Sequence, residues 1–412
     1  MDPCWRLPPD DAARAVLERY LSTGYRPFIP SQFTILASFF LFRSPLSPLA
    51  TSSKIISLGT GTKCLPTCQL PLHGEALHDS HAEIVARRGA IRWFLEEITR
   101  VSRPDSYSSE WLLQHTDGNY DLQEGVHVGM YISTVPCGDA STRFLAAAPQ
   151  DADMAALKES GPRPITDPRS AARGRDNYAL TGVLRTKPGR ADAPPTMSMS
   201  CSDKIAAWSV LGFQGALGSL VLRPLFLEHI VLGGVPDDIR DVVLEDCERA
   251  LWPRAGSSPH RPVISLTSLE FIHSRSALSS MGYDCKASSN ESLSWIADSD
   301  APHEILVNGT RRGVPPKHQL RHKSIPRISQ LALYRLFAPL HDVPHNATYY
   351  GVKQSAQEYR TTKDVLIGPE GAFEGWHRSQ PTWQNFDVDG KVPAETSDGE
   401  PSDVRQKKHS PV

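Results

Sequence analysis

Apolar residues recur along this chain with two alternating periods. Residues 10–22, DDAARAVLERYLS, carry apolar side chains at helical spacing behind an acidic first turn, which predicts a helix. The apolar runs at 33–42 (FTILASFFLF) and 54–62 (KIISLGTGT) have the length of buried strands, and the second ends in a glycine turn. Further strands are expected at 127–134, within 219–234, at 262–271 and at 303–310, with a late helix at 347–366. Interleaved strands and helices indicate an α/β fold.

Two stretches lack this periodicity. Residues 146–176 are polar and rich in proline, which favours a surface insertion. Residues 387–412 have almost nothing to bury, so we expect a disordered tail. The simplest organisation is one domain over residues 1–386, interrupted by the 146–176 insertion.

Composition narrows the class of protein. The chain has 412 residues, enough for a large core, and a formal net charge of -2, which gives no global basic field but allows a local patch. Its seven cysteines form no disulfide framework and favour reduced thiols. The longest apolar run, 33–42, is about half the length of a membrane span. We therefore expect a soluble intracellular protein of the cytoplasm or nucleus, with no membrane contact and no protein partner implied.

The segment DSHAEIVARR at 79–88 places His81 and Glu83 at the start of a predicted helix. A histidine there can bind zinc, and a glutamate two residues later can lie beside the metal without binding it. A surface histidine and a glutamate favoured by the helix dipole are the plainer interpretation of this motif alone.

Two cysteine motifs favour the zinc interpretation of His81 over a surface histidine. VPCGDAS (135–141) and MSCSDKIAAW (199–208) each place a cysteine before a predicted helix N-terminus, where backbone amides stabilise the thiolate that binds zinc. The predicted ligands are His81, Cys137 and Cys201, with a fourth position left for water. Buried core cysteines are the alternative for either motif taken singly.

The other cysteines offer a weaker site. Cys64 and Cys68, with His73 and His78 nearby, could form a compact structural zinc site, although their spacing is loose. Cys4, Cys247 and Cys285 have no partners at ligand spacing, so we expect them to be packing residues.

The helix after His81 also carries cations where apolar side chains are expected. On a helical projection Arg87 falls between Phe94 and Ile98, and Arg88 falls just beyond Leu95. On the late helix, Tyr349, Lys353, Tyr359 and Lys363 share one face with Val352 and Ala356. Buried cations need an anion, which could be a common polyanion or acidic side chains.

The motifs GTGTKC, DSHAEI, VPCGDAS, LRTK, MSCSDKIAAW and LGFQGALGS, with the late Tyr/Lys helix, resemble in order the adenosine deaminase domain of RNA-editing enzymes. The resemblance runs from about residue 57 to 376. It implies a three-layer α/β/α sandwich of the cytidine-deaminase type with extra C-terminal helices. It also implies zinc-dependent hydrolysis of adenosine to inosine, with release of ammonia and with Glu83 as the proton shuttle.

The resemblance implies further residue roles. Thr62 and Lys63 match residues that contact the sugar and phosphate of the target nucleotide, and Asp79, Lys187 and Lys204 match a relay between the zinc site and a buried inositol hexakisphosphate. The inositol-phosphate pattern matches at Arg87, Arg88, Lys204, Trp208, Tyr349, Lys353, Tyr359, Lys363 and Trp376. It departs at Ala207 and Gln330, where the family pattern has Arg and Lys.

Within the family the closer likeness is to the branch that acts on tRNA, at position 37 next to the anticodon of alanine tRNA. Ser141 stands where the double-strand editors have Arg, and LRTKPGR at 184–190 lacks the glutamate with which they replace the flipped base. We also expect no room for a double-stranded-RNA-binding domain before the core. The alternatives are a deaminase of structured messenger RNA and a catalytically dead RNA-binding scaffold stabilised by inositol phosphate.

Overall fold

The computed structural model describes residues 7–43, 53–103, 107–147, 170–175, 180–189, 193–256, 258–301 and 303–393. The helices are α1 (Pro9–Ser22), α2 (Ala82–Val101), α3 (Thr142–Ala147), α5 (Cys201–Leu211), α6 (Gly215–Gly218), α7 (Arg240–Leu251), α8 (Arg275–Ser280), α9 (Gln330–Phe337), α10 (Tyr349–Ser355) and α11 (Gln357–Ile367). None of the helices in these ranges is long and apolar enough to cross a membrane.

A mixed eight-stranded sheet organises the fold. Its strands are β1 (Leu36–Arg43), β2 (Ser53–Thr60), β7 (Val126–Ile132), β10 (His229–Leu232), β11 (Val263–Leu266), β12 (Glu291–Ile296), β13 (His303–Val307) and β14 (Thr310–Arg311). The spatial order is β11-β10-β7-β1-β2-β12-β13-β14. Strand β10 is parallel to β7 and β11, and the remaining neighbours are antiparallel.

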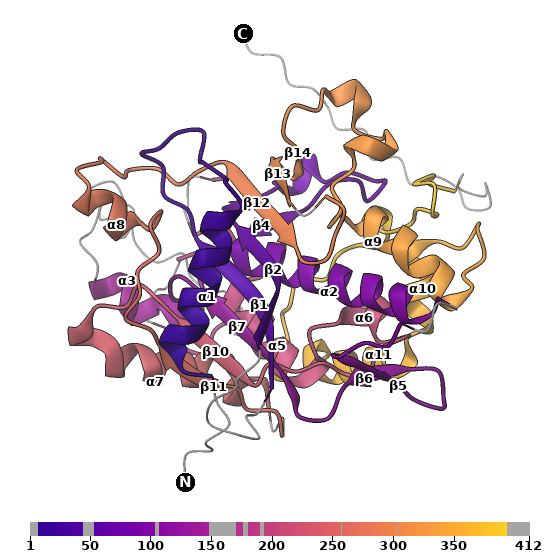
Figure 1. Ribbon diagram of the computed structural model, residues 1–412, viewed down its shortest axis with the longest axis horizontal. Helices are drawn as coiled ribbons and strands as arrows, with labels where there is room; N and C mark the ends of the chain where they lie inside the picture. Colours follow the sequence, from indigo (N-terminus) through magenta and orange to yellow (C-terminus); the bar gives the residue numbers. More distant parts are fainter. Residues whose placement is uncertain are drawn as a thin grey trace.

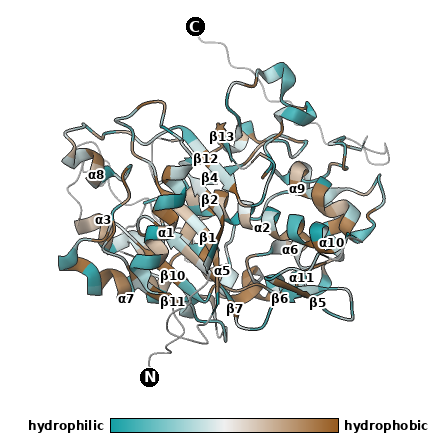
Figure 2. Ribbon diagram, in the orientation of Figure 1, coloured by the Kyte–Doolittle hydropathy of each residue, from teal (hydrophilic) through white to brown (hydrophobic). Residues whose placement is uncertain are grey.

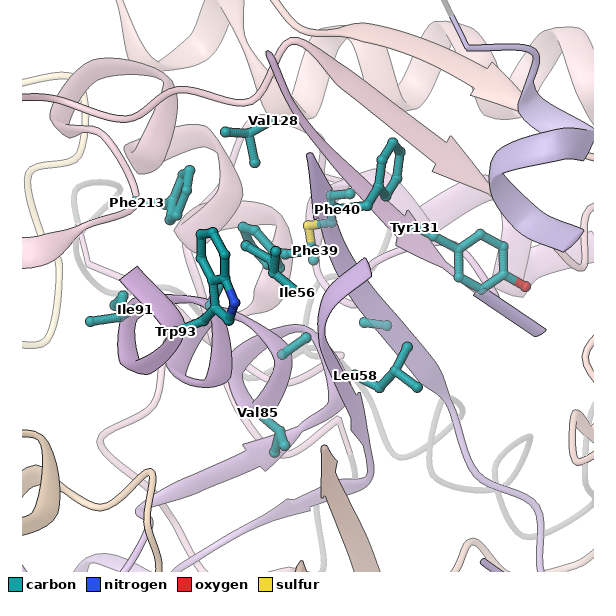
Figure 3. Close-up of a cluster of buried hydrophobic side chains, with 14 of the residues drawn as sticks. Phe39, Phe40, Ile56, Leu58, Val85, Ile91, Trp93, Val128, Tyr131 and Phe213 are labelled. Atoms are coloured by element: carbon teal, nitrogen blue, oxygen red, sulfur yellow. The ribbon is translucent and has the colours of Figure 1, made fainter. Parts of the chain in front are cut away.

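Helices flank the sheet, with α1 and α2 on either side of β1 and β2 (Figure 1). Close approach of α2 to β2 depends on small residues, because a Cβ added at Gly59 would lie 2.5 Å from the backbone nitrogen of Ala86. Side chains from β1, α2 and the loop after α5 pack together in the core, and Figure 3 shows Phe39 of β1 and Phe213 near Trp93 of α2. The rings of Phe39 and Phe213 lie 5.0 Å apart. The α/β prediction is confirmed.

Several predicted elements need correction. The expected late helix at 347–366 is two helices, because Ala356 has ψ of 69° and ends α10 before α11 begins. Of the apolar stretch 219–234, only β10 is a strand. Strand β12 and helices α7 and α9 were not predicted.

A short strand pair supports the region around His81, because β3 (Thr62–Cys64) pairs with β4 (Asp79–His81). Elsewhere β5 (Leu112–Gln114) pairs with β6 (Tyr120–Leu122), whose Tyr120 hydroxyl lies 3.1 Å from Oγ of Ser102 just after α2. Most of the expected 146–176 insertion lies outside the described residues, although β8 (Ala172–Arg173) pairs with β9 (Arg185–Thr186).

The described part of the expected tail, residues 387–393, contacts the core. Arg335 of α9 donates to the carbonyl oxygens of Val388 and Asp389, and the imidazole Nδ1 of His73 lies 2.7 Å from the carbonyl oxygen of Gly390. The remainder of the tail lies outside the described residues.

Candidate active site

Three segments bring His81, Cys137 and Cys201 together. His81 ends β4 and precedes α2, Cys137 follows β7, and Cys201 is the first residue of α5. The Nδ1 atom of His81 lies 3.7 Å from Sγ of Cys137 and 3.6 Å from Sγ of Cys201. All three donor atoms lie within 4.8 Å of one another.

Hydrogen bonds from the first turn of α5 hold the Cys137 loop next to Cys201. The side chain of Ser200 caps that helix by accepting a hydrogen bond from the backbone amide of Asp203. Ser202 donates from its amide and its hydroxyl to the carbonyl oxygen of Cys137, at 3.0 and 2.9 Å. Gly138 has φ of 107°, and a Cβ there would lie 2.1 Å from Oγ of Ser200. Glycine is therefore required where the Cys137 loop meets α5.

This donor set fits zinc. One imidazole nitrogen and two thiolates are ligands that zinc prefers, and three protein ligands leave one coordination position for water or substrate. The backbone amide of Cys201 points to Sγ of Cys137 at 3.4 Å, which favours the thiolate form.

Glu83 lies in the first turn of α2 and is 1% exposed. Among the described residues, its Oε2 atom has no hydrogen-bond partner. Burial raises the pKa of the Glu83 carboxyl, and the neighbouring Cys137 thiolate raises that pKa further. A buried carboxyl with a raised pKa beside a metal-binding cluster suits a group that exchanges a proton during a reaction.

A buried ion-pair network lies next to the cluster. The Nζ atom of Lys187 donates to Oδ2 of Asp79 at 2.8 Å and to Sγ of Cys201 at 3.1 Å. Lys204 donates to the same Asp79 oxygen at 2.5 Å. Burial alone would raise the pKa of Asp79, but the two ammonium groups hold that pKa well below its usual value. The three residues of the predicted relay are thus in direct contact.

Thr62 and Lys63 lie on β3, one strand away from the cluster. Thr62 is opposite His81 in the β3–β4 pair, and Lys63 is opposite Ser80. Gly61 has φ of 136° and turns the chain from β2 into β3, and a Cβ there would lie 2.1 Å from the carbonyl oxygen of Ser80. The sequence placed these residues in a turn, whereas they form a short strand beside the site.

Four cations gather where α2 meets α10 and α11. Arg87 and Arg88 lie on α2, Lys353 on α10 and Lys363 on α11, and all four side chains are half-buried. Burial lowers the pKa of Lys353 to about 8, with further lowering by Arg88 and Arg87. Burial and then Lys353 likewise lower the pKa of Lys363 to about 8. The cations therefore repel one another.

The two arginines donate to neutral carbonyl oxygens, and one of their donors still has no partner in the portion that the structure describes. Arg87 donates to the carbonyl oxygen of Phe213, and Arg88 donates to that of Ile328. Within the described ranges, Nη2 of Arg88 is buried without a partner. Partly buried cations held by carbonyl oxygens, with an unused buried donor, fit a bound polyanion.

Aromatic rings line the same region. The guanidinium of Arg87 lies 5.2 Å from the ring centre of Trp208, and Nζ of Lys353 lies 5.0 Å from that of Tyr349. Tyr359 is close enough to Arg87 to influence its pKa, and Trp376 stacks on Phe373. Ala207 is buried and adds no charge, whereas Oε1 of Gln330 is buried and lacks a hydrogen-bond partner among the described residues.

The alternative zinc site does not assemble. Cys68, His73 and His78 belong to neither of the two groups of potential ligands found in the described parts of the chain. Cys64 instead lies beside Asp79 and donates to Oδ1 at 3.1 Å, a contact that sequence reasoning missed because the two residues meet only through β3–β4 pairing. Cys247 and Cys285 are buried, consistent with packing, and Cys4 lies outside the described residues.

Comparison with known proteins shows which family shares this sequence. Residues 57–380 match the adenosine-deaminase (editase) domain family. The tRNA-specific adenosine deaminase 1 of Drosophila melanogaster is 33% identical over 324 residues, covering 75% of this chain and 76% of that protein. Its Saccharomyces cerevisiae namesake is 28% identical over 388 residues, with coverage of 89% and 92%. The double-stranded RNA-specific editase Adar of Drosophila melanogaster is 31% identical over 232 residues, with coverage of 55% and 33%. The chain therefore belongs to the adenosine-deaminase (editase) domain family.

Proposed function

We propose that this protein is a zinc-dependent enzyme that converts adenosine to inosine in tRNA. The observation that carries this proposal is the convergence of His81, Cys137 and Cys201 beside a buried Glu83 with an unpaired carboxylate oxygen. A binding scaffold has no need of a buried carboxyl at that position, since burying it without a partner costs stability.

The chemistry follows from the positions of these side chains. His81, Cys137 and Cys201 would hold the metal, and a bound zinc lowers the pKa of a water molecule toward neutrality. Glu83 takes the proton from the attacking water and gives it to N1 of adenine as the oxygen bonds to C6. Glu83 then takes the remaining proton from the new hydroxyl on C6 and passes it to the exocyclic amine. The C6–N bond breaks, ammonia leaves, and the C6 oxygen becomes the carbonyl of inosine.

Lys187 supports this arrangement without touching the base. Its ammonium group bonds the Cys201 sulfur and is itself fixed by Asp79. A cation at the sulfur favours the thiolate over the thiol. Asp79 and Lys204 continue the network toward the cation group at Arg87, Arg88, Lys353 and Lys363, where inositol hexakisphosphate is the polyanion that the family resemblance implies.

The substrate class rests on the relatives and on two sequence features. Relatives that match three quarters or more of the chain are named tRNA-specific adenosine deaminases, which favours tRNA for this chain. Ser141 occupies the position of an Arg in the double-strand editors, and 184–190 has no base-replacing glutamate. A loop also presents an adenosine that is already partly unstacked, which reduces the free energy needed to flip it. We propose position 37 of alanine tRNA as the target.

A deaminase of duplex RNA is the second candidate, favoured by the similarity to the Drosophila editase. One assay separates the two. Purified protein is incubated with alanine tRNA, with the same tRNA carrying guanosine at position 37, and with an RNA duplex, and inosine is mapped by reverse transcription. The proposal predicts inosine at position 37 of the first RNA and far slower reaction of the duplex. Equal rates on tRNA and duplex would favour the second candidate, and no inosine in any RNA would contradict both.

A further inference from the structure

One segment is strongly basic although the chain as a whole has a slight net negative charge: residues 311–327, RRGVPPKHQLRHKSIPR. It contains six lysines and arginines, two histidines and no acidic residue, whereas the whole chain has 44 Lys and Arg against 46 Asp and Glu. Because like charges so close together repel, such a segment is favoured mainly where it meets an anion.

The fold keeps this segment ordered. Residues Pro316–His318 and His322–Ser324 form short 3-10 turns. Ile325 is buried at its far end. The guanidinium of Arg311 donates to the carbonyl oxygen of Lys323, which ties the two ends of the segment together. The backbone that carries these cations is therefore held in place on the surface.

These cations fall into two groups. Three arginines pair with glutamates of the domain: Arg311 with Glu304, Arg312 with Glu291 and Arg327 with Glu96. Lys317, Arg321 and Lys323 lie between them, and all three are exposed. In the part of the chain that the structure describes, none of these three side chains has an ion pair. We call Lys317, Arg321 and Lys323 the outer cations.

The segment lies on the same side of the fold as the strand that carries Thr62 and Lys63. The backbone amide of Leu77, two residues before β4, donates to the carbonyl oxygen of Gly309 in the turn between β13 and β14. A cavity of about 370 Å³ is lined by Leu65 and Glu75 on one side and by Arg311, Arg312 and Gln319 on the other. Figure 1 shows the segment above β13 and β14, and Figure 2 shows its short turns as hydrophilic.

We propose that the outer cations form a docking surface for the phosphate backbone of tRNA. This inference rests on the proposed function, since it names how the same active site receives its substrate. Exposed cations without acidic partners suit phosphate contacts, which position a nucleic acid without reading its sequence. Order in the segment reduces the entropy lost on binding.

The test compares two triple variants in binding to unmodified alanine tRNA. K317A/R321A/K323A removes the outer cations. The control R223A/R240A/R261A removes the same charge from exposed or half-exposed arginines near β6 and α7, where each pairs with an acidic residue. The dissociation constant is measured over a range of salt concentrations, and thermal unfolding confirms that each variant is folded.

The proposal predicts that the outer-cation variant binds at least about tenfold more weakly at low salt. A plot of the logarithm of its association constant against the logarithm of salt concentration should also be less steep, by about 2–3 units for the three cations removed. The control variant should keep the slope of the unmodified protein. If the outer-cation variant keeps both affinity and slope, or if both variants change alike, the docking surface is wrong. The proposed function is judged separately, by whether the unmodified protein forms inosine in that tRNA.

Discussion

The ammonium group of Lys187 donates to the carboxylate of Asp79 at 2.8 Å, and both side chains are almost fully buried. The same ammonium group bonds the sulfur of Cys201 at 3.1 Å. One buried lysine thereby joins the candidate metal cluster to the interior ion-pair network. Through this lysine, the carboxylate of Asp79 on β4 and the sulfur of Cys201 on α5 interact electrostatically although they lie far apart in the sequence.

Replacing Lys187 with methionine should destabilise the protein strongly. Asp79 would keep Lys204 but lose its best-buried partner, so the loss should be near the lower end of the about 3–5 kcal/mol typical of a broken buried pair. Chemical denaturation measures this. Lys54→Met is the matched control, because Lys54 pairs with Asp298 at a partly exposed position and should cost about 1 kcal/mol or less. Equal losses in the two variants would show that the buried network has no special role.

The cation group predicts a dependence on a bound polyanion. Burial lowers the pKa of Lys353 and Lys363, Arg88 and Arg87 lower that of Lys353 further, and Lys353 lowers that of Lys363. A polyphosphate should therefore stabilise the folded protein through charge-assisted hydrogen bonds. Mass spectrometry of denatured, purified protein should release inositol hexakisphosphate in near-equal molar amount. Lys353→Met should reduce both ligand content and melting temperature, whereas Lys391→Met, at an exposed lysine, should change neither. Full retention of ligand by Lys353→Met would contradict the assignment.

Stability should also vary with pH in protein stripped of the polyanion. The pKa of Lys353 and of Lys363 is about 8 in the folded protein, below the usual lysine value of 10.5. Between pH 8 and 10 the unfolded chain therefore binds more protons than the folded one, and the free energy of unfolding should rise with pH.

The variant Lys353→Met/Lys363→Met isolates this effect, since all other titrating groups remain. Denaturation at several pH values should give a steeper rise for the stripped protein than for the double variant. Adding inositol hexakisphosphate should flatten the rise, because an anion restores the lysine pKa. Parallel curves for stripped protein and double variant would show that the lysines keep ordinary pKa values.

The structure brings together His81, Cys137 and Cys201, which the sequence motifs had singled out, whereas the sheet was predicted only in part. His81, Glu83, Cys137 and Cys201 stand in short motifs whose residue types already limit the chemistry, so their convergence needed no knowledge of topology. Strand β12 was not predicted because its sequence, ESLSWI, has small polar residues at buried positions. One of them, Ser292, donates its hydroxyl to the carbonyl oxygen of Ser80. The polar–apolar alternation of β12 covers only Ser292 to Trp295, and all six of its positions are buried, so the strand matches neither a long half-buried strand nor a continuous apolar run.

The inward-facing cations also show what helical periodicity can and cannot predict from the sequence. The helical projection placed Arg87 and Arg88 on the core side of α2, and the structure puts them beside α10 and α11. The projection of the late helix as one continuous face was wrong, because the break at Ala356 changes the direction of the chain. Lys353 and Lys363 nonetheless approach the same region, through tertiary packing that no single helix pattern contains.

We propose that Glu83 moves protons beside a zinc ion whose protein ligands are His81, Cys137 and Cys201. Zinc content and inosine formation, both measured on the same purified samples, separate the role of Glu83 from that of the ligands. Glu83→Gln should keep about one zinc per chain while losing activity by at least about 10²-fold, since the amide cannot exchange the proton. Cys201→Ser should lose the metal and the activity, and Cys247→Ser, at a buried cysteine outside the cluster, should keep both. Loss of zinc from Glu83→Gln, or full activity of that variant with zinc bound, would rule out Glu83 as a proton shuttle that does not bind the metal.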